Sequence, residues 1–133
     1  MSQLVGKWKH DHSDNLDNFF KAMKVGIVAR KLAGSTSPSV EITVSDDDTW
    51  TIVTNSGLGK TMTICFKIGD PFEDTRPDGA KVKAMAILED DVLTIKPVDN
   101  PEGPSVSRQV VDGQMTMTLT KGGVTAKRTF KRV

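Results

Sequence analysis

Most of the chain after Pro38 alternates polar and apolar residues as half-buried β-strands do. Val, Ile and Thr dominate these segments, and turn residues such as Asp112-Gly113 and Gly122-Gly123 separate many of them. A further alternating segment lies near the N-terminus. The pattern therefore predicts nine or ten strands, with candidates over residues 4–10, 40–45, 49–54, 61–68, 81–88, 92–97, 105–111, 114–121 and 124–132.

Between residues 14 and 34 the period changes to that of two short helices. The first helix carries an apolar stripe at positions i, i+3, i+4 and i+7, formed by Leu16, Phe19, Phe20 and Met23. We expect residues 13–15 to cap its N-terminus and Gly26 to end it. The second helix is predicted over residues 27–33, with Val28 and Leu32 one turn apart. The helix pair is expected to cover a sheet through the apolar stripe.

The links between most of the predicted strands are short, which favours an antiparallel meander within a single domain of residues 1–133. A long meander loses its exposed edges when it closes into an up-and-down β-barrel. A β-sandwich with Greek-key connections is the main alternative. The helix pair after the first strand fits a lid on a barrel better than a crossover between two sheets.

Two arginines are predicted to lie on the inward face of the last three strands. If both Gly-containing loops are two-residue turns, Arg108 pairs with Met117 and Met117 pairs with Arg128. Alternation puts all three on the apolar face, with the Cα atoms of the two arginines about 9–10 Å apart. An unpaired buried charge costs several kcal/mol, so the arginines need an anion. That anion is either an inward carboxylate of the protein or the acid group of a ligand.

Composition and isolated residues narrow the class of function further. The chain has 18 Lys and Arg against 17 Asp and Glu, a balance that argues against a nucleic-acid partner. One cysteine, Cys65, and the lack of any signal-like or membrane-spanning apolar stretch favour the cytosol. His10 and His12 do not complete a metal site, and we interpret them as surface residues. No nucleophile–base set indicates an enzyme, and no cofactor is expected.

The order and spacing of five short motifs resemble those of the intracellular lipid-binding proteins, specifically the cytoplasmic fatty acid-binding proteins. The resemblance covers essentially the whole chain. Its motifs are Gly6-Lys7-Trp8-Lys9, Val25-Gly26 with Ala29-Arg30-Lys31, Phe66-Lys67-Ile68-Gly69, Asp78-Gly79 followed by Lys81-Val82-Lys83, and Lys127-Arg128-Thr129-Phe130.

The resemblance implies a ten-stranded clamshell barrel with a helix-turn-helix lid, and the binding and transport of a long-chain fatty acid without catalysis, metal or cofactor. It places the ligand carboxylate at Arg108 and Arg128, while Phe130 stands where the family has a Tyr. We therefore expect Phe130 to weaken binding rather than abolish it, because the acyl tail supplies most of the affinity. A carrier of retinoic acid or another bulky acid, and a ligand-free interaction protein, are the alternatives.

The resemblance also implies which residues surround the ligand. The expected cavity lining comprises Phe130, Met117, Met115, Leu119, Leu16, Phe19, Val25, Ala29, Pro38, Leu58 and Asp78. Transient contact with an anionic membrane surface is expected at the portal, through Lys21, Lys24, Arg30, Lys31 and Leu58. A solvated basic helix face is the plainer interpretation of the same cations. The family is usually monomeric, and some members enter the nucleus through basic lid residues.

Overall fold

The computed structural model describes residues 2–34, 36–57, 59–75, 81–99 and 103–133. Within them, two helices follow the first strand, α1 (Leu16–Ala22) and α2 (Ile27–Gly34). The strands are β1 (Gly6–Asp14), β2 (Ser39–Val44), β3 (Trp50–Asn55), β4 (Thr61–Phe66), β5 (Phe72–Thr75), β6 (Lys81–Glu89), β7 (Val92–Pro97), β8 (Ser105–Val111), β9 (Gln114–Lys121) and β10 (Val124–Arg132).

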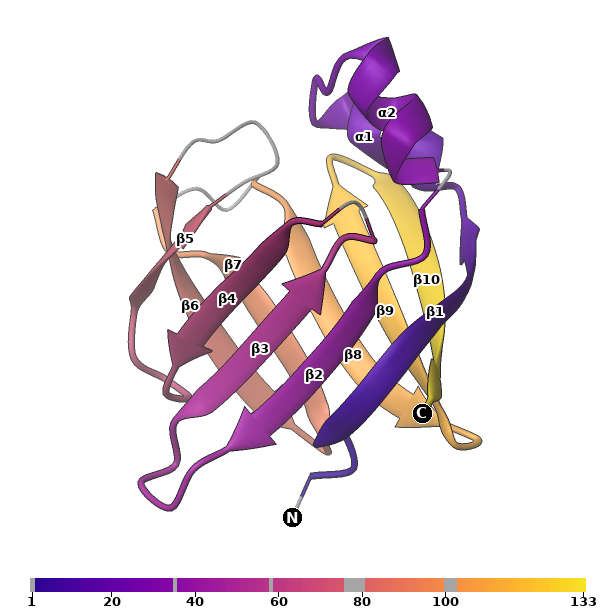
Figure 1. The fold of residues 1–133 in the computed structure, drawn as a ribbon. Helices are drawn as coiled ribbons and strands as arrows, with labels where there is room; N and C mark the ends of the chain where they lie inside the picture. Colours follow the sequence, from indigo (N-terminus) through magenta and orange to yellow (C-terminus); the bar gives the residue numbers. More distant parts are fainter. Residues whose placement is uncertain (1, 35, 58, 76–80, 100–102) are drawn as a thin grey trace.

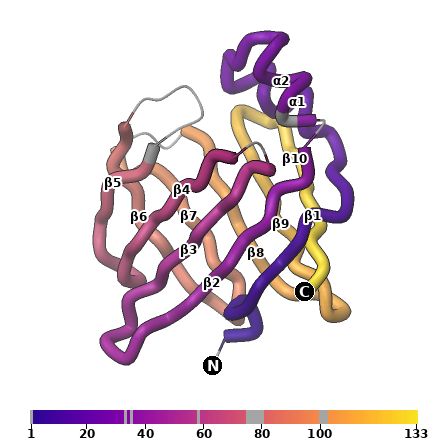
Figure 2. Tube along the Cα trace, in the orientation of Figure 1, coloured from indigo at the N-terminus to yellow at the C-terminus, as the bar shows by residue number. Residues whose placement is uncertain are grey.

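The ten strands form a single antiparallel sheet that curls into a nearly closed barrel, with both helices at one end (Figure 1). Strands that follow one another in sequence pair, except β4 and β5, and β1 also pairs with β10, so that the order is β4-β3-β2-β1-β10-β9-β8-β7-β6-β5. The edges of the sheet are β4 and β5, and Figure 2 shows the trace coming round from one to the other. The predicted up-and-down barrel with a helical lid is confirmed.

The structure adds one strand and moves two helix ends. Strand β5 has four residues, too short for alternation to reveal it. Of the three predicted capping residues 13–15, Ser13 and Asp14 continue β1 and only Asn15 takes the N-cap position. The N-cap is Asn15 in the left-handed conformation, without a side-chain cap hydrogen bond. Helix α1 ends at Ala22, and Lys24 takes the positive φ that we expected to need a glycine at position 26.

A β-bulge in β1 changes which of its residues share a face with β10. His10 pairs with Phe130, but His12 pairs with Thr129, because one extra residue is inserted between the two histidines. The shifted register brings Ser13 opposite Arg128. Strict alternation would have placed His12, and not Ser13, on the face that Arg128 shares.

The apolar residues gather in two clusters that together line the barrel. The larger one joins strands β1–β4, β6, β7, β9 and β10, with Leu4, Trp8, Ile42, Leu93 and Phe130 among its most buried side chains. The smaller one joins α1 to β9 and β10, through Leu16, Phe19, Met23, Leu119 and Ala126. The predicted apolar stripe thus fastens the lid, as expected. On α2, by contrast, Val28 and Leu32 are exposed.

Arg132 holds the N-terminal segment against the last strand. Its guanidinium lies 4.1 Å from the centroid of the Trp8 ring and donates hydrogen bonds to the carbonyls of Gln3 and Val5. Gly6 makes room for this contact, since a Cβ at that position would lie 2.4 Å from Nη1 of Arg132. The φ of Gly6 is 145°, which side chains rarely adopt.

We therefore expect Gly6→Ala to lower the free energy of unfolding by about 1–3 kcal/mol, through backbone strain and displacement of Arg132. Urea denaturation measures the change. The matched control is Gly34→Ala at the end of α2, where nothing lies within 4 Å of the added methyl and the change should stay within about 0.5 kcal/mol. Equal effects of the two substitutions would contradict this account of Gly6.

Candidate functional site

The row of inward side chains predicted across the last three strands is present. Arg108 of β8 pairs with Met117 of β9, and Met117 pairs with Arg128 of β10. The same row continues to Ser13 on β1 and to Leu93 on β7. Both turns have the two-residue length that turn chemistry predicted, which is why the register could be derived from sequence.

Arg108 is a cation buried in an apolar interior. Only 7% of the residue is exposed, and its Nε has no hydrogen-bond partner among the described residues. Burial lowers the pKa of Arg108 to about 10, while the negative charge of Asp74 raises it. At neutral pH the side chain is therefore still charged. Asp74 is the inward carboxylate that the sequence did not reveal, because it lies on the short strand β5.

Arg128 is half-buried and already has one partner. Its Nε donates a hydrogen bond of 3.1 Å to Oγ of Ser13, the residue that the β-bulge brings opposite. Burial lowers the pKa of Arg128 as well. Within the described part of the chain its two terminal nitrogens have no hydrogen-bond partner, and these are the atoms best placed in a guanidinium for binding a carboxylate.

His10 belongs to this group, although the sequence suggested a surface residue. Its Nε2 lies 2.7 Å from Oγ of Ser13, and its ring meets the Phe130 ring edge to face at 5.6 Å. Burial lowers the pKa of His10, and the charge of Arg128 lowers it further. His12 is exposed as expected, with its Nδ1 2.7 Å from a carboxylate oxygen of Asp11. His10 is half-buried, so its interpretation as a surface residue holds only in part: its Nδ1 is buried and its ring contacts Phe130, because β1 points alternate residues inward up to the bulge.

A cavity of about 240 Å³ lies inside the barrel on the side of the helices. Its wall is mostly apolar, and the charged residues in it include Arg108 and Asp74. The lining residues are Phe19, Phe20, Met23, Ile52, Thr54, Met62, Ile64, Asp74, Val82, Ala84, Ile95, Lys96, Pro97, Pro104, Val106, Arg108, Met117 and Leu119.

The structure brings some of the expected lining residues to this cavity and not others. Arg108, Phe19, Met117 and Leu119 line it. Other expected lining residues are buried or half-buried beside it without lining it, namely Leu16, Val25, Pro38, Met115 and Phe130. Ala29 is exposed on α2. Leu58 and Asp78 lie outside the described residues. The lining residues that sequence reasoning missed come mainly from β3 to β7, with others from α1 and from the start of β8.

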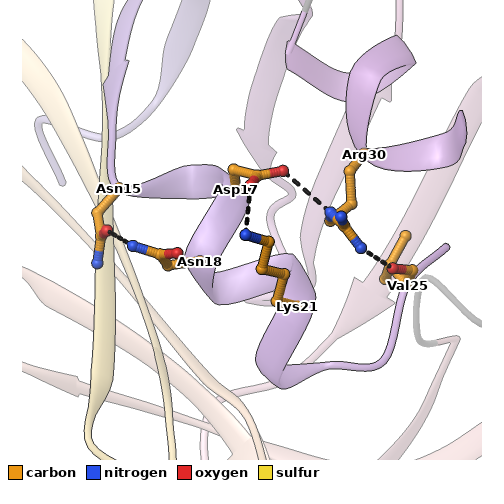
Figure 3. Close-up of polar contacts among 6 residues, drawn as sticks. All are labelled: Asn15, Asp17, Asn18, Lys21, Val25 and Arg30. Atoms are coloured by element: carbon orange, nitrogen blue, oxygen red, sulfur yellow. Dashed lines mark hydrogen bonds and ion pairs between the residues drawn. The ribbon is translucent and has the colours of Figure 1, made fainter. Parts of the chain in front are cut away.

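The cations of the lid fall into two groups, those that form ion pairs and those that do not. Figure 3 shows the first group, Lys21 and Arg30. Asp17 of α1 pairs with Arg30 of α2 at 3.0 Å and with Lys21 at 3.5 Å. Arg30 also donates a hydrogen bond of 2.9 Å to the carbonyl of Val25, so it ties the two helices together. Lys24 and Lys31 are exposed and form no ion pair with another described residue.

The described ranges contain neither a candidate metal site nor a candidate membrane-spanning helix. No group of three or more His, Cys, Asp or Glu side chains there could hold a metal ion. Neither described helix is long and apolar enough to cross a membrane. The polar side chains of the candidate site are therefore those of Arg108, Arg128, Ser13, His10 and Asp74. Together they suit the binding of an anionic group.

Comparison with known proteins places the chain in a well-populated group. The model of the lipocalin / cytosolic fatty-acid binding protein family matches residues 5–133. A fatty acid-binding protein of Tyrophagus putrescentiae is 40% identical over 132 residues, covering 99% of both chains. Sodium/calcium exchanger regulatory protein 1 of Doryteuthis pealeii is 37% identical, covering 99% of this chain and 98% of that one.

A solved structure supports the same assignment. The fatty acid binding protein of Schistosoma mansoni in complex with arachidonic acid has a TM-score of 0.90 and 31% identity, covering 100% of this chain and 98% of that chain.

Replacing Arg108 by Met tests whether the charge of this residue stabilises the folded protein. We expect Arg108→Met to raise the free energy of unfolding by about 1–3 kcal/mol, because an apolar side chain of similar length avoids the desolvation penalty. Urea denaturation without added lipid measures it. Arg132→Met is the contrasting control and should destabilise, since it removes two hydrogen bonds and the contact with Trp8. A loss of stability in Arg108→Met would instead make Arg108 part of a structural ion pair.

Proposed function

Because the chain belongs to the lipocalin / cytosolic fatty-acid binding protein family, we propose that it binds and carries a long-chain fatty acid inside its barrel. This family consists of binding and transport proteins rather than enzymes. In the proposal the carboxylate is held between Arg108 and Arg128, and the acyl tail lies in the apolar cavity. The cytosol is the compartment that the sequence favours for such a carrier.

The observation that carries the proposal is the buried guanidinium of Arg108 in a largely apolar cavity. A charge in such a place costs several kcal/mol unless an anion accompanies it. Asp74 supplies one negative charge near it, and a ligand carboxylate would supply a second acceptor group within the same cavity. Arg128, on the same row two strands away, offers its terminal nitrogens to that group.

The tail supplies most of the affinity in this proposal. Each buried methylene contributes about 0.8 kcal/mol, so a long acyl chain offers on the order of 10 kcal/mol before ordering costs. A charge-assisted hydrogen bond adds about 1.5–3 kcal/mol. The cavity of about 240 Å³ is small for a whole lipid. Methionines at positions 23, 62 and 117 line it, and their flexible side chains can yield space to the tail.

Competition separates this proposal from the alternative ligands. Palmitate and oleate should displace a bound fluorescent fatty acid more effectively than retinoic acid or a bile acid, because the cavity is too small for a rigid ring system without larger movements. Stronger displacement by a bulky acid would identify that class as the ligand. If native mass spectrometry finds no lipid adduct after any of these acids is added, the ligand-free interaction protein becomes the better reading.

We also propose that the carrier exchanges ligand at an anionic membrane surface through α2. The exposed apolar side chains of this helix are Ile27, Val28 and Leu32, and the exposed cations Lys24 and Lys31 lie beside them in sequence. Apolar insertion together with about 1 kcal/mol for each cation near an anionic surface would support transient binding. Lys21 and Arg30 are less suited to this role, since Asp17 holds both.

Removing both guanidiniums tests the carboxylate site. We expect Arg108→Met/Arg128→Met to weaken oleate binding about 100-fold, the loss of roughly 3 kcal/mol of charge-assisted hydrogen bonding. Binding of oleyl alcohol should stay within about threefold of that of the wild type. Titration of each ligand by calorimetry or by displacement of a fluorescent probe gives both affinities.

Lys127→Met is the matched control, because Lys127 is exposed and neighbours Arg128 on the outward face of β10. It should leave the ratio of acid to alcohol affinity unchanged. An unaltered ratio in the double variant as well would exclude the proposed carboxylate site.

The apolar face of α2 is tested by the rate of ligand transfer to vesicles. We expect Val28→Ser/Leu32→Ser to slow the transfer of a fluorescent fatty acid to phosphatidylserine-containing vesicles about tenfold, because two exposed apolar side chains no longer insert. Val111→Ser is the matched control: Val111 is equally an exposed apolar residue, but it ends β8 at the barrel end away from the helices (Figure 1). Equal transfer rates for all three proteins would contradict the role of α2.

A further inference from the structure

Two buried nitrogens in the barrel interior have no hydrogen-bond partner among the described residues, and they are Nε of Arg108 and Nδ1 of His10. Buried polar atoms are almost always paired, because leaving one unpaired costs about 1–3 kcal/mol. Arg108 belongs to the proposed carboxylate site. His10 lies near the other arginine of that site, and neither the proposed function nor the barrel packing accounts for its free nitrogen.

The contacts of Ser13 allow the neutral ring of His10 to carry its hydrogen on Nδ1. Nε of Arg128 is only ever a donor, so it donates to Oγ of Ser13 at 3.1 Å. Oγ of Ser13 is also 2.7 Å from Nε2 of His10. Oγ of Ser13 can donate its own hydrogen to Nε2, an arrangement that both contact distances allow. The neutral ring then carries its own hydrogen on Nδ1.

This chain of donors leaves the Nδ1–H of His10 as a buried donor that lacks an acceptor. The ring is kept neutral by its surroundings, since burial and the charge of Arg128 both lower the pKa of His10. The other charged or titratable neighbours that act on it are Asp11 and His12 of its own strand. The Phe130 ring, which meets the His10 ring edge to face, has no polar atom to accept the hydrogen.

We propose that His10 is a third donor to the acid group of the ligand, with its Nδ1–H binding a carboxylate oxygen beside the terminal nitrogens of Arg128. Ser13 positions both partners, because it takes Nε of Arg128 and Nε2 of His10 and leaves the remaining N–H groups for the ligand. The β-bulge makes this arrangement possible by moving Ser13 opposite Arg128. This inference rests on the proposed function and names a further specificity residue of the same site.

The decisive variants are His10→Leu, which removes the donor, and His10→Asn, whose side-chain amide can place an N–H close to the position of Nδ1. We expect His10→Leu to weaken oleate binding about tenfold, as for one hydrogen bond to a charged acceptor, and His10→Asn to recover most of that loss. Binding of oleyl alcohol should change by no more than about twofold in either variant. His12→Leu, at the exposed histidine two residues on, should match the wild type.

Nitrogen NMR of the wild-type protein supplies a readout that packing alone would not change. We expect the His10 ring to be protonated at Nδ1 in the free protein, and the Nδ1–H resonance to shift when oleate, but not oleyl alcohol, is added.

The outcomes separate this inference from the proposed function. A wild-type protein that binds no fatty acid overturns both. Selective acid binding that His10→Leu leaves intact, or a ring protonated at Nε2, overturns the role of His10 alone. An equal loss of acid and alcohol affinity in His10→Leu would also overturn it, because that result reports a change in packing.

Discussion

The pairing of the first strand with the last is the interaction on which the rest of the structure depends. Without it the ten strands would form two separate meanders, β1 to β4 and β5 to β10, and the β1–β10 ladder joins them in the middle of one sheet that curls around an interior. Arg132 reinforces this seam by binding the N-terminal carbonyls over the Trp8 ring. The same ladder contains the bulge that sets Ser13 opposite Arg128. One feature of backbone pairing thus closes the barrel and assembles the polar group inside it.

The interior combines two opposing requirements. Apolar packing stabilises the barrel, in which Trp8, Leu93 and Phe130 are almost fully buried. Towards the helices, the chain keeps the charge of Arg108 in a cavity, at a cost that burial imposes on any unpaired ion. In the function that we propose, this cost maintains a site for the ligand carboxylate, and the apolar surroundings strengthen the attraction. The lid closes over that cavity through α1, whereas α2 exposes apolar side chains to the outside.

Local signals predicted most of the fold. Alternation and turn residues identified nine strands, and the two Gly-containing turns fixed the register of β8, β9 and β10, which placed Arg108 and Arg128 on one inward row. The apolar stripe of α1 identified the face that covers the barrel. Of the residues predicted to cap α1, only Asn15 is the N-cap, because β1 continues to Asp14 and backbone pairing with β10 overrides the capping preference of Ser13 and Asp14. Strand β5 escaped prediction because four residues do not establish a period.

The sequence by itself thus determined the class of fold, the register of the last three strands and the inward position of the two arginines. Alternation and turn chemistry reveal these features because they act over a few neighbouring residues. Only the tertiary structure decided what surrounds those arginines. The charge of Asp74 acts on Arg108 from strand β5, which no sequence pattern predicted. Ser13 accepts a hydrogen bond from Arg128, which is 115 residues away in the sequence. His10 became an interior residue through the same long-range pairing. Such contacts depend on how distant segments close on one another, and a bulge of one residue is enough to change them.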